Sequence, residues 1–144
     1  MKFSYVRYSK AVVRPVIPIR VSYGSFSTAY DVLVDSGADI NVFSNELADV
    51  LGINLKSGVP ASVLGPTGHP AEVFIHPVEL MVGEHTFTAQ VAFMPTSNPF
   101  GLAGQRGFFD QFEVKFSLRK EELELSVGAL SRGGVTIILG LATS

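Results

Sequence analysis

Short apolar runs, rich in β-branched residues and separated by glycine- and proline-containing turns, make up most of the hydrophobic pattern of this chain. Runs of this kind predict β-strands, and paired runs with a short polar break between them predict hairpins. The pattern therefore predicts a mostly β domain with a closed, barrel-like sheet. Strands are expected over 12–23, 29–34, 40–43, 59–64, 71–75, 77–82, 85–94, 113–118 and 123–126.

One or two short helices are expected among these strands. Ser44 is a suitable N-cap for a helix that ends near Val50 or Leu51, because its hydroxyl can accept a hydrogen bond from the first turn. In that helix Leu47, Val50 and Leu51 are predicted to share one face, with Gly52 at the C-terminus. A second helix is predicted over 105–112, where three phenylalanines at helical spacing are expected to pack in the core: Phe108, Phe109 and Phe112.

The 144 residues correspond to one domain, which we place at 1–126. Residues 127–144 are interpreted as a C-terminal tail that is either flexible or forms a strand at a dimer interface. Its run Val135–Leu139 has strong β character and no obvious partner in the chain, so we expect it to pair across an interface or to pack on the domain's own surface.

Composition narrows the classes of partner and chemistry. The chain is 47% hydrophobic and 17% charged, with a formal net charge of -2 and no basic run, so nucleic acid is not an expected partner. It contains no cysteine, which excludes disulfides, zinc–thiolate sites and a cysteine nucleophile. No apolar run approaches the ~20 residues of a membrane helix, and the N-terminal residues do not resemble a signal peptide. We therefore expect a cytoplasmic protein that does not contact membranes.

The chemically informative segment runs from Leu33 to Phe43 and reads Leu-Val-Asp-Ser-Gly-Ala-Asp-Ile-Asn-Val-Phe. Asp35 ends an apolar strand and is followed by a hydroxyl residue and a glycine. Hydrolysis of a peptide bond without a metal needs a base that activates water and an acid that protonates the leaving amide. Two adjacent carboxylates that share one proton can supply both. Gly37 permits a sharp turn, and the Ser36 hydroxyl can hydrogen-bond across the junction of two such loops.

This segment resembles the active-site motif of the retropepsin-like aspartic proteases, in which two hydrophobic residues precede Asp-Thr/Ser-Gly-Ala-Asp. Residues 44–53, with Leu51-Gly52-Ile53, are similar to the short helix that follows the motif in bacterial members. The loop 64–69 occupies the position of the family's glycine-containing flap. Leu102-Ala103-Gly104 and the residues after it resemble the family's second hydrophobic-hydrophobic-Gly segment. The resemblance covers about residues 14–125.

The resemblance implies a retropepsin-like barrel and assigns roles to particular residues. Asp35 would be the catalytic aspartate, with Ser36 and Gly37 supporting the active-site loop. The substrate main chain would be contacted by residues of that loop and of the flap: Gly37, Ala38, Asp39, Gly65, Pro66, Thr67 and Gly68. We expect Val32, Val34, Val63 and Ile75 to be candidates for lining side-chain pockets. No cofactor and no metal are implied.

A homodimer follows from the single motif. No second Asp-Ser/Thr-Gly occurs in the chain, so a pair of catalytic carboxylates requires Asp35 from two copies that meet on a two-fold axis. The expected activity is that of an aspartic endopeptidase acting on extended peptides or proteins.

Two departures from the family pattern affect details of the site. Gln105 stands where many viral relatives have an arginine, which puts an Asp39–arginine ion pair in question, and Pro66-Thr67 makes a stiffer flap centre.

Other interpretations are weaker. The three histidines, His69, His76 and His85, lack the spacing of a zinc site. The glycines of 101–107 lack phosphate-loop or dinucleotide spacing. The remaining alternative belongs to another class of function, a retropepsin-like domain that has no catalysis and serves as a dimerisation or peptide-binding module. The presence of Asp35-Ser36-Gly37-Ala38 favours the enzyme, because a binding module has no need for a pair of carboxylates.

Overall fold

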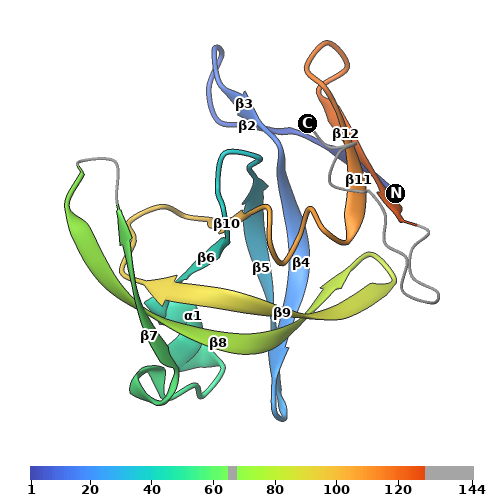
Figure 1. The fold of residues 1–144 in the computed structure, drawn as a ribbon. Coiled ribbons are helices and arrows are strands. Elements are labelled where there is room, and N and C mark those ends of the chain that lie inside the picture. Colours follow the sequence, from blue (N-terminus) through green and yellow to red (C-terminus); the bar gives the residue numbers. More distant parts are fainter. Residues whose placement is uncertain (65–67, 129–144) are drawn as a thin grey trace.

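The computed structural model describes residues 1–64 and 68–128, and most of these residues lie in β-strands (Figure 1). In chain order the elements are β1 (Lys2–Ser4), β2 (Val6–Arg7), β3 (Val13–Arg14), β4 (Val16–Tyr23), β5 (Phe26–Val34), β6 (Asn41–Ser44), α1 (Asn45–Val50), the 3-10 turn η1 (Leu55–Ser57), β7 (Val59–Leu64), β8 (Pro70–Val82), β9 (His85–Met94), β10 (Gly101–Ala103), β11 (Phe112–Ser117) and β12 (Glu122–Val127). The expected mostly β fold is confirmed.

The central feature is a closed barrel. Strands β4, β5, β10, β6, β9 and β8 follow one another in one hydrogen-bonded sheet, and β4 also pairs with β8 through Val21 and Leu80, so the sheet closes on itself. Strand β7 extends the sheet beyond β8 and forms with it a long hairpin that projects from the barrel (Figure 1). Gly83, with φ of +60°, makes the tight turn between β8 and β9 that the sequence predicts.

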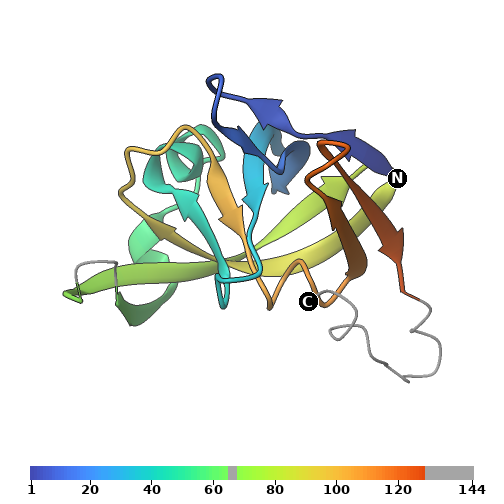
Figure 2. The same cartoon turned by 90° about the horizontal axis from the view of Figure 1, so that it is seen from above.

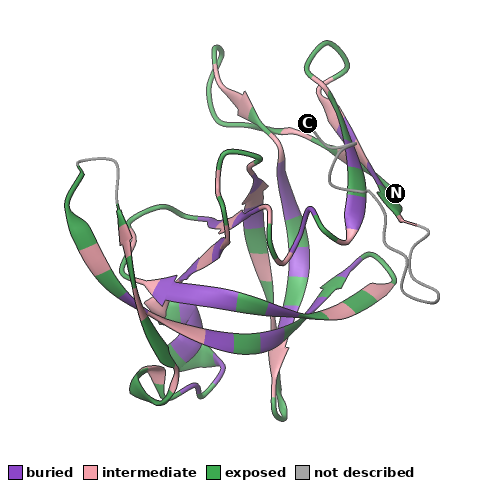
Figure 3. Ribbon diagram, viewed as in Figure 1, coloured by how far each residue is buried: buried purple, intermediate pink, exposed green. Residues whose placement is uncertain are grey.

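The barrel interior holds the hydrophobic core. Along β4 the buried residues Ile17, Ile19 and Val21 alternate with exposed ones, as expected for a strand with one face in the core. Strand β8 alternates in the same way over its second half, whereas β9 has three consecutive buried residues near its end (Figure 3). The largest fully buried side chains are phenylalanines: Phe43, Phe93, Phe108, Phe109 and Phe112.

The segment 105–111 is a series of turns and not the second helix predicted from the sequence. The Phe109 N–H donates to the Gly104 carbonyl and the Asp110 N–H to the Gln105 carbonyl, each spanning five residues instead of the four of an α-helix. Gly107 has a φ of +99°, which lies outside the helical region. The three phenylalanines are nevertheless in the core, which confirms that part of the prediction.

Helix α1 begins where the sequence predicts. The Ser44 hydroxyl accepts a hydrogen bond of 3.1 Å from the Glu46 N–H and thereby caps the helix. Leu47 is buried, but Val50 is 59% exposed, so the predicted shared face is wrong for Val50. The helix has only six residues, and two of them are buried: Leu47 and its neighbour Ala48. Ala48 is fully buried in the core.

A second, three-stranded sheet with the order β1-β12-β11 joins the two ends of the described chain. The sequence predicts the β11–β12 hairpin but not β1, whose partner in β12 lies about 120 residues away, as Lys2 is opposite Glu124. The N-terminal amino group donates to the Leu125 carbonyl at 2.8 Å. This sheet and the projecting β7–β8 hairpin lie on opposite sides of the barrel in both views (Figure 1 and Figure 2).

Strand β12 ends at Val127, one residue beyond the predicted domain boundary. The predicted tail from 129 onward, including Val135–Leu139, lies outside the described residues, so its role as an interface strand stays a prediction. Within 1–64 and 68–128, no helix is long and apolar enough to cross a membrane.

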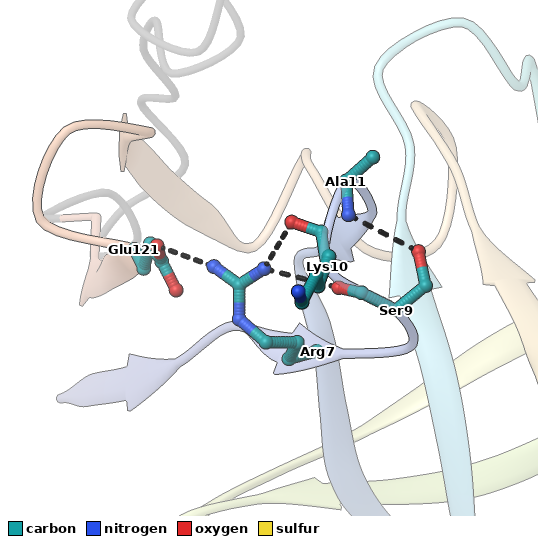
Figure 4. Close-up of polar contacts among 5 residues, drawn as sticks. All are labelled: Arg7, Ser9, Lys10, Ala11 and Glu121. Atoms are coloured by element: carbon teal, nitrogen blue, oxygen red, sulfur yellow. Dashed lines mark hydrogen bonds and ion pairs between the residues drawn. The ribbon is translucent and has the colours of Figure 1, made fainter.

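Arg7 fixes the N-terminal hairpin β2–β3 to the β11–β12 turn (Figure 4). Its guanidinium pairs with the Glu121 carboxylate at 2.8 Å and donates to the carbonyls of Ser9 and Lys10 at 3.0 and 2.9 Å. The main-chain carbonyl of Glu121 also accepts a hydrogen bond of 2.8 Å from the Tyr5 N–H. Both charged side chains are nearly half exposed, at 49% and 45%, so solvent weakens their attraction.

Replacement of Arg7 by methionine is expected to lower the free energy of unfolding by about 1 kcal/mol, because the exposed ion pair contributes little and the carbonyl bonds contribute more. Glu121→Gln removes only the charge of the pair and should lower it by less than about 0.5 kcal/mol. Urea denaturation of the purified proteins measures both values. Equal losses in the two variants would contradict this division between the ion pair and the carbonyl bonds.

Candidate active site

Asp35 lies directly after β5, in a loop of residues 35–40 that leads into β6 and is called here the Asp35 loop. Strand β10 lies between these two strands, parallel to β5 and antiparallel to β6. The Asp35 loop therefore passes over the end of β10. The Asp35 N–H donates to the Ala103 carbonyl at 3.0 Å, which holds the start of the loop against the last residue of β10.

The Asp35 carboxylate is held by its own loop. The Gly37 N–H donates to Asp35 Oδ1 at 2.8 Å, and the Ala38 N–H donates to the Asp35 carbonyl at 3.1 Å. Asp35 is half-buried, whereas Ser36, Gly37 and Asp39 are exposed. A Cβ atom at Gly37 would lie 3.2 Å from Asp35 Oδ1, so glycine leaves room for the carboxylate at this turn. The arrangement presents one oriented carboxylate at the surface of the chain.

The second glycine-containing segment of the sequence packs against this loop. Residues 103–107, called here the Gly104 segment, contribute the N–H groups of Gln105 and Arg106, which donate to the carbonyls of Ala38 at 2.8 Å and Asp39 at 3.0 Å. A Cβ atom added at Gly104 would lie 2.5 Å from the Ile40 carbonyl oxygen and 2.7 Å from that of Ala38. Only glycine permits this close approach of the two backbones.

Asn41 connects the same two segments from inside the protein. Its side chain is fully buried, with Oδ1 accepting the Gly104 N–H at 2.9 Å and Nδ2 donating to the Gly107 carbonyl at 3.0 Å. From the sequence, Asn41 is expected only as a member of the short strand 40–43. The strand alternation could have indicated this role, because it places Asn41 on the same inward face as Phe43. A buried amide on that face needs hydrogen-bond partners.

Gln105 does not form an ion pair or a hydrogen bond with Asp39 through its side chain. Its Nε2 instead donates to the Ser36 carbonyl at 2.7 Å. In residues 1–64 and 68–128, Arg7 and Glu121 form an ion pair with nitrogen and oxygen atoms within 4.0 Å of each other. No basic side chain in these residues lies that close to the Asp39 carboxylate. Within this part of the chain, no arginine therefore pairs with Asp39.

The β7–β8 hairpin encloses the segment 64–69, which the sequence resemblance predicts to be a flap, and is called here the flap hairpin. Its strands pair from Val59 opposite Ile75 to Leu64 opposite Pro70. Leu64 is 74% exposed, and Gly68 is exposed with a φ of +82°, as a turn glycine permits. The other predicted substrate-binding residues of the flap, Gly65, Pro66 and Thr67, lie outside the described residues.

The four candidates for pocket lining divide into two pairs. Val32 and Val34 are 0% and 2% exposed and belong to the barrel core, so they do not line a surface pocket. Val63 and Ile75 are half-buried on one face of the flap hairpin. A cavity of about 370 Å³ lies between the end of the Asp35 loop and the base of the flap. It is lined by Ile40, Ile75, Thr88, Ala89, Gln90, Ala92, Arg106, Gly107, Asp110 and Gln111.

The histidines have structural partners or lie at the surface. The His76 ring is buried with Nε2 2.9 Å from the Leu55 carbonyl, and His85 Nε2 is 3.1 Å from Gln111 Oε1. His69 is exposed. In the described part of the chain, no group of three or more histidine, cysteine, aspartate or glutamate side chains is arranged to hold a metal ion.

Comparisons with known proteins agree with this geometry. The family model described as "Aspartyl protease" matches residues 17–141, which is most of the chain. Among solved structures, the EIAV protease complexed with the inhibitor HBY-793 is similar, with a TM-score of 0.51 and 21% sequence identity over 69% of this chain and 88% of that chain. No curated protein matches the sequence.

The structural similarity confirms the predicted fold, a retropepsin-like β-barrel. The expectation that this is a bacterial-type member stays a prediction. The match to the family model spans both the Asp35 loop and the Gly104 segment, the two parts that build the site described above. The chain therefore belongs to the aspartyl protease family.

Proposed function

We propose that the chain is an aspartic endopeptidase that acts as a homodimer and hydrolyses peptide bonds with water activated between two Asp35 carboxylates. The observation that carries the proposal is the orientation of Asp35. Its carboxylate is fixed by the Gly37 N–H at 2.8 Å and lies at the surface of the chain, at the end of a β-strand. A single carboxylate cannot act as both acid and base in one step, so a second copy has to supply the partner.

The reaction follows from a pair of carboxyl groups that share one proton. The ionised carboxylate takes a proton from water while the water oxygen bonds to the carbonyl carbon of the substrate. The protonated partner gives its proton to the carbonyl oxygen. When the tetrahedral intermediate collapses, the C–N bond breaks, the amide nitrogen receives the proton that the first carboxylate took from water, and a hydroxyl of the intermediate returns its proton to the partner carboxylate. The products are a new carboxyl group and a new amine, and the pair again shares one proton. In this scheme Ser36 joins the two loops, and Gly37, Ala38 and Asp39 bind the peptide main chain.

The flap supplies the opposite wall of the proposed peptide site. An extended peptide between two β-structured surfaces is held mainly by backbone hydrogen bonds, and side-chain pockets add specificity. Val63 and Ile75 present aliphatic side chains on one face of the hairpin. Ile40 and Ala92 continue this apolar lining into the cavity beside the Asp35 loop. We therefore propose peptides with apolar residues near the cleaved bond as substrates.

Dilution tests the dimer requirement. We expect cleavage of a diverse peptide pool to rise more steeply than linearly with protein concentration while dimers assemble, and to become linear once sizing shows that all chains are dimeric. A cleavage rate proportional to concentration in a range where sizing shows only monomers would contradict the shared active site. A confirmed dimer that cleaves no peptide between about pH 2 and pH 7, a range that includes the pH at which carboxyl pairs share one proton, would favour a non-catalytic binding module.

A further inference from the structure

Gln105 is the residue whose side chain links the Gly104 segment to the peptide that follows Asp35. Its Nε2 donates to the Ser36 carbonyl at 2.7 Å. The backbone hydrogen bonds between the two segments are no shorter: 3.0 Å from the Asp35 N–H, 2.8 Å from the Gln105 N–H and 3.0 Å from the Arg106 N–H. The side-chain amide therefore adds a contact to these three, at the Ser36 carbonyl that the backbone bonds leave free.

The Ser36 carbonyl and the Gly37 N–H belong to one peptide unit. That unit is planar, so its C=O and N–H groups cannot rotate independently. The Gly37 N–H is the group that donates to Asp35 Oδ1, at 2.8 Å. Gln105 holds the oxygen end of this plane, and the Asp35 carboxylate accepts the hydrogen bond from its nitrogen end. Donation to a carbonyl also polarises the amide and strengthens its N–H as a donor.

We propose that Gln105 is a positioning residue that fixes the Asp35 carboxylate through the Ser36–Gly37 peptide. The inference rests on the proposed function, because the carboxylate that it orients is the proposed catalytic one. Gly37 has no Cβ, and both Ser36 and Gly37 are exposed, so little else restrains the plane of their peptide. A tether to the carbonyl oxygen is what limits its rotation, and with it the direction of the Gly37 N–H.

Replacement of Gln105 by methionine tests the proposal because methionine keeps the length of the side chain and removes the donor. We expect kcat to fall about fivefold to tenfold, the equivalent of one hydrogen bond, with KM changed less than about twofold. The solvent exchange rate of the Gly37 amide, measured by NMR, should rise by a similar factor. Because the Gln105–Ser36 bond is exposed, sizing and thermal unfolding should show an intact dimer.

Two further variants show whether the N–H donor of the Gln105 side chain is what matters. Gln105→Arg restores N–H groups at the end of the side chain and should keep kcat within about threefold of the native value. Asn54→Leu removes another amide from the surface, at a position before η1 where the side chain makes no capping bond, and should leave kcat and Gly37 exchange unchanged. Equal losses in the methionine and arginine variants would overturn the role of the donor.

The result also distinguishes this inference from the proposed function. Native Gly37 exchange and native kcat in Gln105→Met would overturn the positioning role and leave the protease intact. Should the native chain cleave no peptide, the proposed function fails, and Gly37 exchange alone decides whether Gln105 orders the peptide. Unchanged exchange in that case overturns the inference as well.

Discussion

Asp35→Asn is expected to reduce peptide cleavage by on the order of a thousandfold or more, because asparagine can neither accept the proton of the attacking water nor share one with a second carboxyl group. The side chain keeps its size, and its Oδ1 can still accept the Gly37 N–H that contacts Asp35 in the native chain. The fold and the dimer should therefore survive. The measurement is the rate of cleavage of the best peptide from the pool, together with sizing of both proteins.

Asp31→Asn is the matched control. Asp31 lies on the same strand, β5, four residues before Asp35; it is exposed and is opposite Pro18 in the register with β4. It should cleave at a rate within about twofold of the native one, as surface substitutions generally do. Similar losses in both variants would indicate a general effect of lowered charge, and substantial activity of Asp35→Asn would exclude the proposed mechanism.

Mixed dimers give an independent measure of the shared site. When native and Asp35→Asn chains are combined in equal amounts and allowed to exchange, about a quarter of the dimers contain two native chains if pairing is random. Activity per total chain should then fall to about one quarter of the native value. A fall to only one half would show that each chain works alone, because half of the chains keep their carboxylate.

The parts of the fold that the sequence predicts are those in which local chemistry decides. The β8–β9 hairpin follows from two apolar runs on either side of Gly83-Glu84, and the Ser44 cap follows from a hydroxyl at the start of an apolar helix. Strand β1 is missed because its partner, β12, is remote in the chain and its own three residues have no distinctive pattern. The segment 105–111 is misjudged because the phenylalanine spacing fits a helix, whereas Gly107 places its backbone outside the helical region.

The candidate site also contains residues that can be predicted from the sequence and contacts that cannot. Asp35, Ser36 and Gly37 are recognisable because their chemistry follows directly from their order in the chain. The contacts of Asn41 and Gln105 are not, since they depend on which backbone groups of the Gly104 segment come within reach after folding. The same holds for Val32 and Val34, whose place in the core depends on which face of β5 turns inward. Strand alternation gives two faces and does not say which one is buried.

Asn41→Ala is expected to lower the free energy of unfolding by about 3 kcal/mol, the largest loss in stability among the variants considered. Asn41 is fully buried and makes two hydrogen bonds, to the Gly104 N–H at 2.9 Å and to the Gly107 carbonyl at 3.0 Å. Alanine leaves the buried N–H of Gly104 without its acceptor, which costs about 1–3 kcal/mol, and opens a small cavity. Urea denaturation of the two proteins measures the difference.

Asn54→Ala is the matched control, because Asn54 is exposed and its side chain makes no capping hydrogen bond. This variant should change the free energy of unfolding by less than about 0.5 kcal/mol.

Asn41 also lies where the Asp35 loop enters β6, so loss of its side chain should displace the Gly104 segment that supports the loop. Cleavage by Asn41→Ala should therefore fall even at temperatures where the variant is folded. A variant as stable as the native chain would show that the buried amide does not connect the two segments energetically, and that the backbone bonds between them are sufficient.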